Sequence, residues 1–144
     1  MLRKRIVATL VIKNGIVVQS IGFNRYLPVG NALICVEFLN KWGIDEIVLL
    51  DIDKTAQGKG PDFKLITEVS KKSFVPLTVG GGIRDLNDIR KLIHCGADKI
   101  SINKAAIKTP KIIKEAANIF GTQCIVISMD VKKKNGRYEI YSDN

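Results

Sequence analysis

The sequence has few cysteines, few aromatic residues and no long apolar run, and each shortage excludes a class of protein. The three cysteines, Cys35, Cys95 and Cys124, are odd in number and far apart, which excludes a small secreted domain held by disulfides. We expect them to be buried free thiols in a reducing compartment. The apolar run of residues 6–12 ends at Lys13 and is too short for a signal peptide or a membrane span. A cytoplasmic protein without membrane contact is therefore expected.

Acidic residues are also scarce relative to basic ones. The chain has 14 Asp and Glu against 23 Lys and Arg, a net charge of +9, which favours acidic or phosphorylated partners. Nucleic acid is disfavoured as a partner, because aromatic residues make up only 6% and are not interleaved with basic ones. Lysines occur in every expected helix, so most should lie on solvated faces.

Apolar segments with strand character alternate with amphipathic segments along the chain. Helical spacing of apolar residues predicts helices at residues 31–42, from Pro61, from Asp85, and after a cap at Thr109 and Pro110. The apolar runs predict strands at residues 5–12, 46–52, 74–79, 99–103 and 123–130. The remaining segments are expected to be a small hairpin arm in a long loop at residues 17–23, a polar loop at 54–60, and a hairpin at 131–144 around Asn135 and Gly136.

Four strand–helix units in succession indicate an α/β fold with a parallel sheet. Residues 43–47 and 96–100 each end a helix and enter a strand, an internal echo that favours a (βα)8 barrel or part of one. A doubly wound sheet is the competing architecture. A complete barrel needs about 200 residues or more. We therefore expect residues 1–144 to be a single partial TIM barrel domain, (βα)1–4 plus strand 5, without its carboxyl-terminal half.

A glycine run separates the third strand from the next helix. Residues 80–82 are all glycine, and Asp85 then begins the helix. Glycine lets the backbone approach a ligand closely, and a helix amino terminus offers unpaired N–H groups to an anion. The pattern favours a phosphate site at Gly81 and Gly82. A tight turn that needs positive φ explains the same glycines without any ligand.

Alternate residues of a barrel strand face its interior. The phase that places Gly80 and Gly82 at the ligand end puts Arg5, Glu46 and Lys99 at the bottom of three strands, where they can form an ion-pair ring. The positions above this ring are small and hydroxylated where barrels usually carry bulky side chains: Thr9, Thr78, Ser101 and Ser128. This arrangement fits a gate on a channel for a small polar molecule, and it fits equally a structural cluster that closes the barrel floor.

Polar residues end the strands at the opposite, carboxyl-terminal side. Asn103 and Asp130 end the fourth and fifth strands, and Asp51 lies next to the end of the second. Because a carboxylate in this place indicates catalysis in barrels, Asp130 is the candidate catalytic residue, with Asp51 and Asn103 as substrate contacts. Alternatively, Asp130 only caps its strand or binds a loop.

Five segments together resemble the cyclase subunit of imidazole glycerol phosphate synthase: residues 1–6, 49–52, 77–85, 96–103 and 121–126. The sister isomerase of histidine biosynthesis shares the glycines and the strand-five aspartate, but its amino terminus is less similar. The resemblance implies a glutaminase subunit docked at the barrel bottom and ammonia passing through the core to a phosphorylated small-molecule substrate, without cofactor or metal. It implies gate roles for Arg5, Glu46 and Lys99, phosphate contacts for Gly82 and Asn103, and acid–base catalysis by Asp130.

The chain departs from the family pattern at Val11, where cyclases carry an aspartate that works with the strand-five aspartate. Losing a general acid or base typically removes ~10²–10⁴-fold of rate, so enzymatic activity is left open. Gln19 replaces a basic loop residue, and Lys104 replaces a hydroxyl beside Asn103. These departures favour a divergent branch that passes ammonia to a separate amidotransferase for sugar amidation in surface-polysaccharide pathways.

Two alternatives remain beside that branch: a true cyclase of histidine biosynthesis, and a truncated chain with no activity of its own. Whatever the function, a sheet of five parallel strands would leave the outer edges of its first and fifth strands unpaired. Open edges invite pairing, so the chain alone is expected to dimerise, aggregate or need its missing half.

Overall fold

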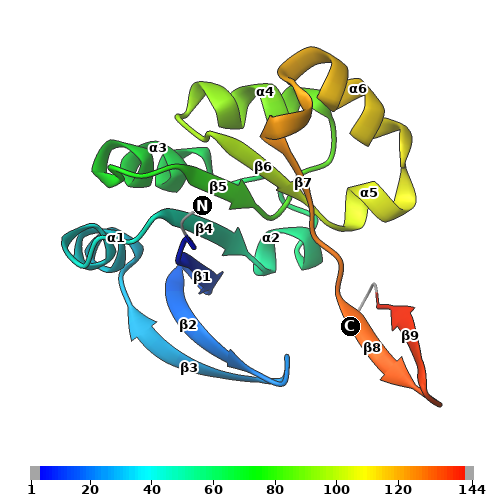
Figure 1. The fold of residues 1–144 in the computed structure, drawn as a ribbon, viewed down its shortest axis with the longest axis horizontal. Helices are drawn as coiled ribbons and strands as arrows, with labels where there is room; N and C mark the ends of the chain where they lie inside the picture. Colours follow the sequence, from blue (N-terminus) through cyan, green and yellow to red (C-terminus); the bar gives the residue numbers. More distant parts are fainter. Residues whose placement is uncertain (1–3, 142–144) are drawn as a thin grey trace.

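A curved, mostly parallel sheet forms the framework of the molecule, and the computed structural model describes residues 4–141 (Figure 1). Its seven strands follow the spatial order β3-β2-β1-β4-β5-β6-β7. The pairs β1–β4, β4–β5, β5–β6 and β6–β7 are all parallel. This confirms the predicted α/β class and partial barrel. The parallel strands are β1 (Val7–Lys13), β4 (Glu46–Asp51), β5 (Leu77–Gly80), β6 (Lys99–Ile102) and β7 (Ile125–Ile127).

Helices cover one face of this sheet (Figure 1). The main ones are α1 (Ala32–Lys41), α3 (Phe63–Lys72), α4 (Leu86–His94) and α6 (Lys111–Phe120). Three short helices that the sequence did not predict lie in the connections: α2 (Asp53–Ala56), α5 (Lys104–Lys108) and the 3-10 helix η1 (Thr122–Cys124). The predicted polar loop at residues 54–60 is therefore wrong for its first three residues, which are helical.

The hydrophobic core lies between the sheet and the main helices. Alternate strand residues supply one side of it: Ile47, Leu49, Leu77, Val79, Ile100 and Ile102, all buried. The helices supply buried residues such as Val36, Val69, Ile89 and Ala116. The residues between these on each strand form the inner face, which starts with Glu46 on β4 and Thr78 on β5. Val7 and Val126, at its two margins, are 47% and 37% exposed, so the inner face is open at its margins.

Side-chain caps set where several helices begin. Asn31, Asp62 and Asp85 each accept a hydrogen bond from a backbone N–H in the first turn of α1, α3 and α4, as N-cap residues do. The cap at Asp85 was predicted, but α3 begins at Phe63 behind Asp62, so the predicted start at Pro61 is wrong. At α6, Pro110 occupies the cap position without a side-chain hydrogen bond, because proline has no side-chain acceptor.

Two hairpins extend beyond the parallel strands. The first, β2 (Ile16–Ile21) and β3 (Arg25–Gly30), is longer than the predicted arm and pairs with β1 through Ile16, Val17 and Val18. The expected unpaired edge of strand one is therefore wrong for Val11–Lys13. The second, β8 (Val131–Lys134) and β9 (Arg137–Ile140), turns at Asn135 and Gly136 as predicted and projects from the body (Figure 1). The predicted hairpin's last residues, 142–144, lie outside the described part.

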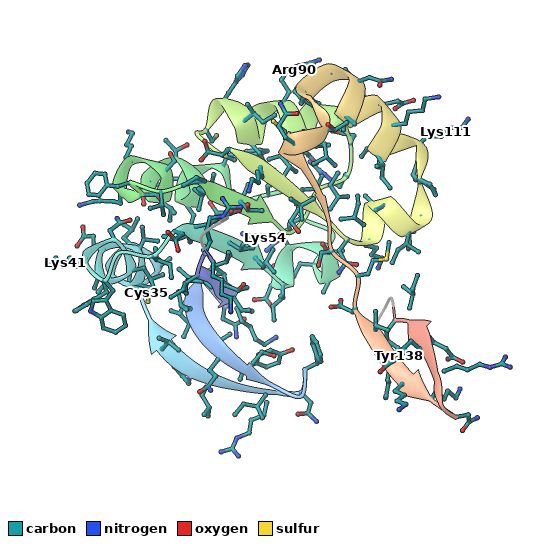
Figure 2. All side chains as sticks on the ribbon, viewed as in Figure 1. Cys35, Lys41, Lys54, Arg90, Lys111 and Tyr138 are labelled. Atoms are coloured by element: carbon teal, nitrogen blue, oxygen red, sulfur yellow. The ribbon has the colours of Figure 1, made fainter. Side chains whose placement is uncertain are left out.

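The surface agrees with the charge pattern of the sequence. Lys41, Arg90 and Lys111 are exposed and project outward from the helices (Figure 2). The three cysteines are free, as predicted, but they are half-buried instead of buried. Within residues 4–141, no helix combines the length and apolar character needed to cross a membrane.

Candidate functional site

A carboxylate, an ammonium group and a hydroxyl meet at the amino-terminal end of the inner face. Lys99 Nζ lies 2.8 and 2.9 Å from the two oxygens of Glu46, and Thr78 Oγ1 donates to Glu46 Oε1 at 3.0 Å. The three come from β6, β4 and β5; the pairing sets Lys99 opposite Thr78 and Thr78 opposite Val48, two residues after Glu46 on the same face. Burial raises the pKa of Glu46, but hydrogen bonds from Lys99 and Thr78, with the nearby positive charges, outweigh it and lower the pKa overall.

Arg5 is the third residue of the predicted gate. Its side chain is exposed just before β1, and its positive charge helps to lower the pKa of Glu46. Among residues 4–141, no hydrogen bond or ion pair joins Arg5 to Glu46. The structure thus brings Glu46 and Lys99 into direct contact, with the charge of Arg5 acting on Glu46 at longer range.

Hydroxyl side chains continue upward from this cluster along the inner face. Thr78 and Ser101 are 2% and 6% exposed, so both predicted channel-lining residues are buried on central strands. Thr9 is exposed and Ser128 half-buried, because Thr9 lies on β1 and Ser128 directly follows β7, near the two margins. Val11 faces the same side, since it pairs with Leu50 of β4.

The carboxyl-terminal end of the inner face brings Asn103 and Asp130 together. Asn103 Nδ2 donates to Asp130 Oδ2 at 3.0 Å, and the backbone carbonyl of Asp130 accepts from Tyr141 N at 2.7 Å. The first bond fixes the carboxylate toward the end of β6, and the second ties the backbone of Asp130 to the residue that follows β9. Asp130 is therefore held from both sides at the mouth predicted for the active site.

A cavity of about 370 Å³ opens beside Asp130 between the two hairpins. Besides Asp130, its lining includes Phe23 from the β2–β3 turn and Lys132 and Tyr141 from the second hairpin. Lys132 Nζ lies 5.4 Å from the centre of the Tyr141 ring, in cation–π range. The sequence did not single out Phe23, Lys132 or Tyr141, because only the folded chain brings the two turns together.

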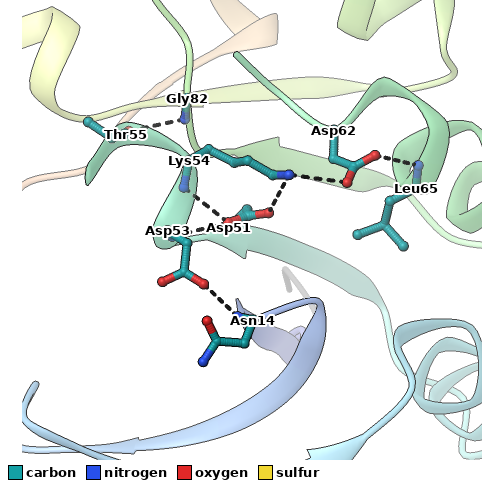
Figure 3. Close-up of polar contacts among 8 residues, drawn as sticks. All are labelled: Asn14, Asp51, Asp53, Lys54, Thr55, Asp62, Leu65 and Gly82. Atoms are coloured by element: carbon teal, nitrogen blue, oxygen red, sulfur yellow. Dashed lines mark hydrogen bonds and ion pairs between the residues drawn. The ribbon is translucent and has the colours of Figure 1, made fainter. Parts of the chain in front are cut away.

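The glycine turn after β5 is covered by the chain itself. A Cβ on Gly81 would lie 2.1 Å from the carbonyl oxygen of Asp51, and one on Gly82 would lie 2.8 Å from the carbonyl oxygen of Lys59. Both glycines also have positive φ, 111° and 70°. The N–H of Gly82 donates to Thr55 Oγ1 at 3.1 Å (Figure 3). The close approach predicted for these glycines is thus made by the segment around α2.

Asp51 organises that covering segment. Its Oδ1 accepts from the N–H groups of Asp53 and Lys54, so the carboxylate supports the first turn of α2 (Figure 3). Lys54 Nζ reaches Asp62 at 3.2 Å and Asp51 at 3.9 Å. Burial raises the pKa of Asp51, and these hydrogen bonds and the Lys54 charge only partly offset it. Asp51, predicted as a substrate contact, has its Oδ1 committed to the fold here.

Asp53 connects the same segment to the β1–β2 turn. Its carboxylate accepts a hydrogen bond from Asn14 N (Figure 3). It also accepts one from Lys13 Nζ. The bond from Asn14 is the largest cause of the lowered pKa of Asp53. The α2 segment is consequently fixed at three points, by Asp53, by Lys54 and by Thr55.

Residues 5–143 match the family described as histidine biosynthesis protein. The chain belongs to the histidine biosynthesis protein family. A protein of Vibrio vulnificus (strain YJ016), provisionally named imidazole glycerol phosphate synthase subunit hisF2, is 45% identical over 141 residues, 98% of this chain and 52% of that relative. The imidazole glycerol phosphate synthase subunit HisF of Clostridium botulinum (strain Kyoto / Type A2) is 44% identical over 137 residues, 95% of this chain and 54% of that relative.

HisF of Methanococcus maripaludis (strain C6 / ATCC BAA-1332) is 47% identical over 133 residues, 92% of this chain and 49% of that relative. This member of the histidine biosynthesis protein family thus spans about half the length of the curated relatives it matches. The similarity to imidazole glycerol phosphate synthase subunits agrees with the resemblance read from the sequence. In the described part of the chain, no group of three or more His, Cys, Asp or Glu side chains could hold a metal ion.

Proposed function

We propose that this chain forms half of a barrel subunit that takes ammonia from a glutaminase partner and delivers it to a separate amidotransferase for sugar amidation in surface-polysaccharide biosynthesis. The observation that carries the proposal is the polar column on the inner face, from Glu46 and Lys99 through Thr78 to Ser101. The chain has this column, but it carries Val11 at the position where cyclases have a second acid–base group. Delivery needs the column, and cyclisation needs the missing carboxylate.

The column has the chemistry that an ammonia path requires. Ammonia accepts one hydrogen bond and donates three, so a buried route must offer both donors and acceptors. The Glu46 carboxylate accepts, the Thr78 and Ser101 hydroxyls do both, and Thr78 and Ser101 are buried. The Lys99 ammonium stands at the entrance, bound to Glu46, where it can hold the carboxylate across the path or release it.

The same sheet end offers the surface on which a glutaminase would dock. Phe74 and Trp42 lie in the connections that enter β5 and β4 and are 87% and 79% exposed. Large aromatic side chains are enriched at protein interfaces. A phosphorylated substrate or the acceptor's amidotransferase would lie at the opposite end, near Gly81, Gly82, Asn103 and Asp130.

The test is the amount of acceptor amidated per glutamine consumed, measured with the glutaminase and amidotransferase partners present. Lys99→Met fills similar volume without the charge, so we expect glutamine hydrolysis to continue while the ratio falls. Lys111→Met, on the exposed face of α6, is the matched control and should leave the ratio unchanged. If Lys99→Met lowers only the melting temperature at equal folded fraction, Lys99 and Glu46 are structural and the proposal is wrong.

A second candidate is cyclase activity in histidine biosynthesis, favoured by the Asn103–Asp130 contact and by the names of the relatives. We expect negligible imidazole glycerol phosphate formation when the chain is supplied with the carboxyl-terminal half of the Clostridium botulinum relative and ammonium. Val11→Asp should raise turnover by about 10²-fold or more, the usual worth of an acid–base group. Robust turnover by the unmodified chain would replace the first proposal with this one.

A further inference from the structure

The segment that follows β4 occupies the place where the proposed phosphate would bind. Thr55 Oγ1 accepts the hydrogen bond of the Gly82 N–H, and this N–H is one of the donors that the proposed phosphate contact requires. Glycine N–H groups in such turns bind anions through the same geometry that a hydroxyl acceptor uses. A phosphate oxygen and the Thr55 hydroxyl therefore cannot both accept from Gly82 along the same direction.

The segment around α2 lies directly on the glycine turn after β5. It packs closely against Gly82 in addition to making the Thr55 hydrogen bond. A Cβ at Gly82 would lie 2.8 Å from Lys54 Cβ and 2.9 Å from the carbonyl carbon of Gly60. The Lys54 side chain before Thr55 and the backbone of Gly60 after it thus lie against Gly82, which is itself buried. Thr55 itself is exposed, so its side chain can leave Gly82 toward solvent without breaking the core.

We propose that Thr55 is an internal competitor for the Gly82 N–H and sets the affinity of this turn for phosphate. This inference rests on the proposed phosphate site at Gly82 and Asn103. In the free chain, the Thr55 hydroxyl satisfies the Gly82 donor, which would otherwise be a costly unpaired group in a buried turn. A phosphate monoester displaces the hydroxyl and moves the α2 segment aside, while Asp53, bound to Asn14 and Lys13, keeps the segment attached.

The expected effect follows from one hydrogen bond. Removing the competing hydroxyl with Thr55→Ala should tighten phosphate binding by about fivefold, the factor that corresponds to ~1 kcal/mol. Thr55→Ser keeps the hydroxyl and should bind phosphate as the unmodified chain does. A residue that only supports the fold would give the opposite order, because its removal would weaken binding.

The experiment follows amide signals of the isotope-labelled full chain during titration with inorganic phosphate at constant ionic strength. The Gly82 amide should exchange slowly with solvent in the unmodified chain and fast in Thr55→Ala, and phosphate should shift it at about fivefold lower concentration in the variant. Thr122→Ala, in exposed η1, controls for the loss of a threonine elsewhere.

The outcomes separate this inference from the proposed site. Equal phosphate affinity in the unmodified chain and Thr55→Ala, with Gly82 shifting in both, would overturn the competition and leave the site. Shifts at Asn103 without shifts at Gly82 would also overturn the competition, and they would restrict the phosphate site to the residues around Asn103 at the end of β6. The absence of shifts at both residues in every variant would overturn the phosphate site and the inference together.

Discussion

The contact between Glu46 and Lys99 makes a sharp prediction about stability and pH. Glu46→Gln keeps an acceptor for Thr78 and nearly the same volume, but it removes the charge that attracts Lys99. Hydrogen bonds to charged groups contribute ~1.5–3 kcal/mol, and breaking one side of a fully buried pair costs ~3–5 kcal/mol. The Lys99 side chain is 29% exposed and that of Glu46 9%, so solvent screens the pair and we expect a loss of ~1–2 kcal/mol near pH 7.

The pH dependence has a definite sign. The pKa of folded Glu46 is lowered from its ordinary value of 4.5, so its charge stabilises the folded state above about pH 4.5. That contribution is lost as the pH falls through the lowered folded pKa. The stability difference between the unmodified chain and Glu46→Gln should therefore be constant near neutrality and shrink toward zero below about pH 4.5.

Urea unfolding from about pH 7 to about pH 3.5 measures this difference directly. Glu68→Gln, on the exposed face of α3, is the control and should follow the unmodified chain within about 0.5 kcal/mol throughout. A difference for Glu46→Gln that does not change with pH would refute the reasoning. So would a variant as stable as the unmodified chain near neutrality.

Two further predictions concern the glycine turn and the sheet edges. Gly81→Ala should lower the free energy of unfolding by more than about 2 kcal/mol in urea, because its Cβ would meet the Asp51 carbonyl oxygen. The control Gly15→Ala, at a glycine with positive φ but nothing within 4 Å, should lower it by only ~1–2 kcal/mol. Equal losses in the two variants would contradict the steric argument. The chain should associate at micromolar concentration, because β7 and Val7–Leu10 of β1 present open edges; sedimentation as a stable, dispersed monomer would contradict this.

Much of the fold was predictable because its signals are local. Residues 47–50 are all apolar, as expected of a strand covered on both faces, and Asp85 caps α4 as its position indicated. The short helices α2 and α5 were missed because helices of four or five residues carry no periodic apolar face. The helix start behind Pro61 was misplaced because Asp62 competes for the cap, and a carboxylate acceptor decides that position.

The sequence predicted on which face of the sheet the site residues lie, but it did not predict the contacts between loops. Strand alternation correctly put Glu46, Thr78 and Lys99 on one face, which the pairing of β4, β5 and β6 confirms. It gave no sign that Thr55 would bind the Gly82 N–H, because that contact depends on how the chain returns over the turn after β4. Spacing along one strand carries information about faces, and contacts between loops depend on the whole fold.

The pairing of β2 with Val11–Lys13 also limits how the sheet can be extended. On the side of β1 away from β4, this pairing occupies the upper part of the strand and leaves Val7–Leu10 for any further strand. An incoming strand must therefore end its ladder before Val11, and a shift by one residue would turn its apolar side chains to the wrong face. The β2–β3 hairpin thus limits how far a strand added at this edge can pair along β1.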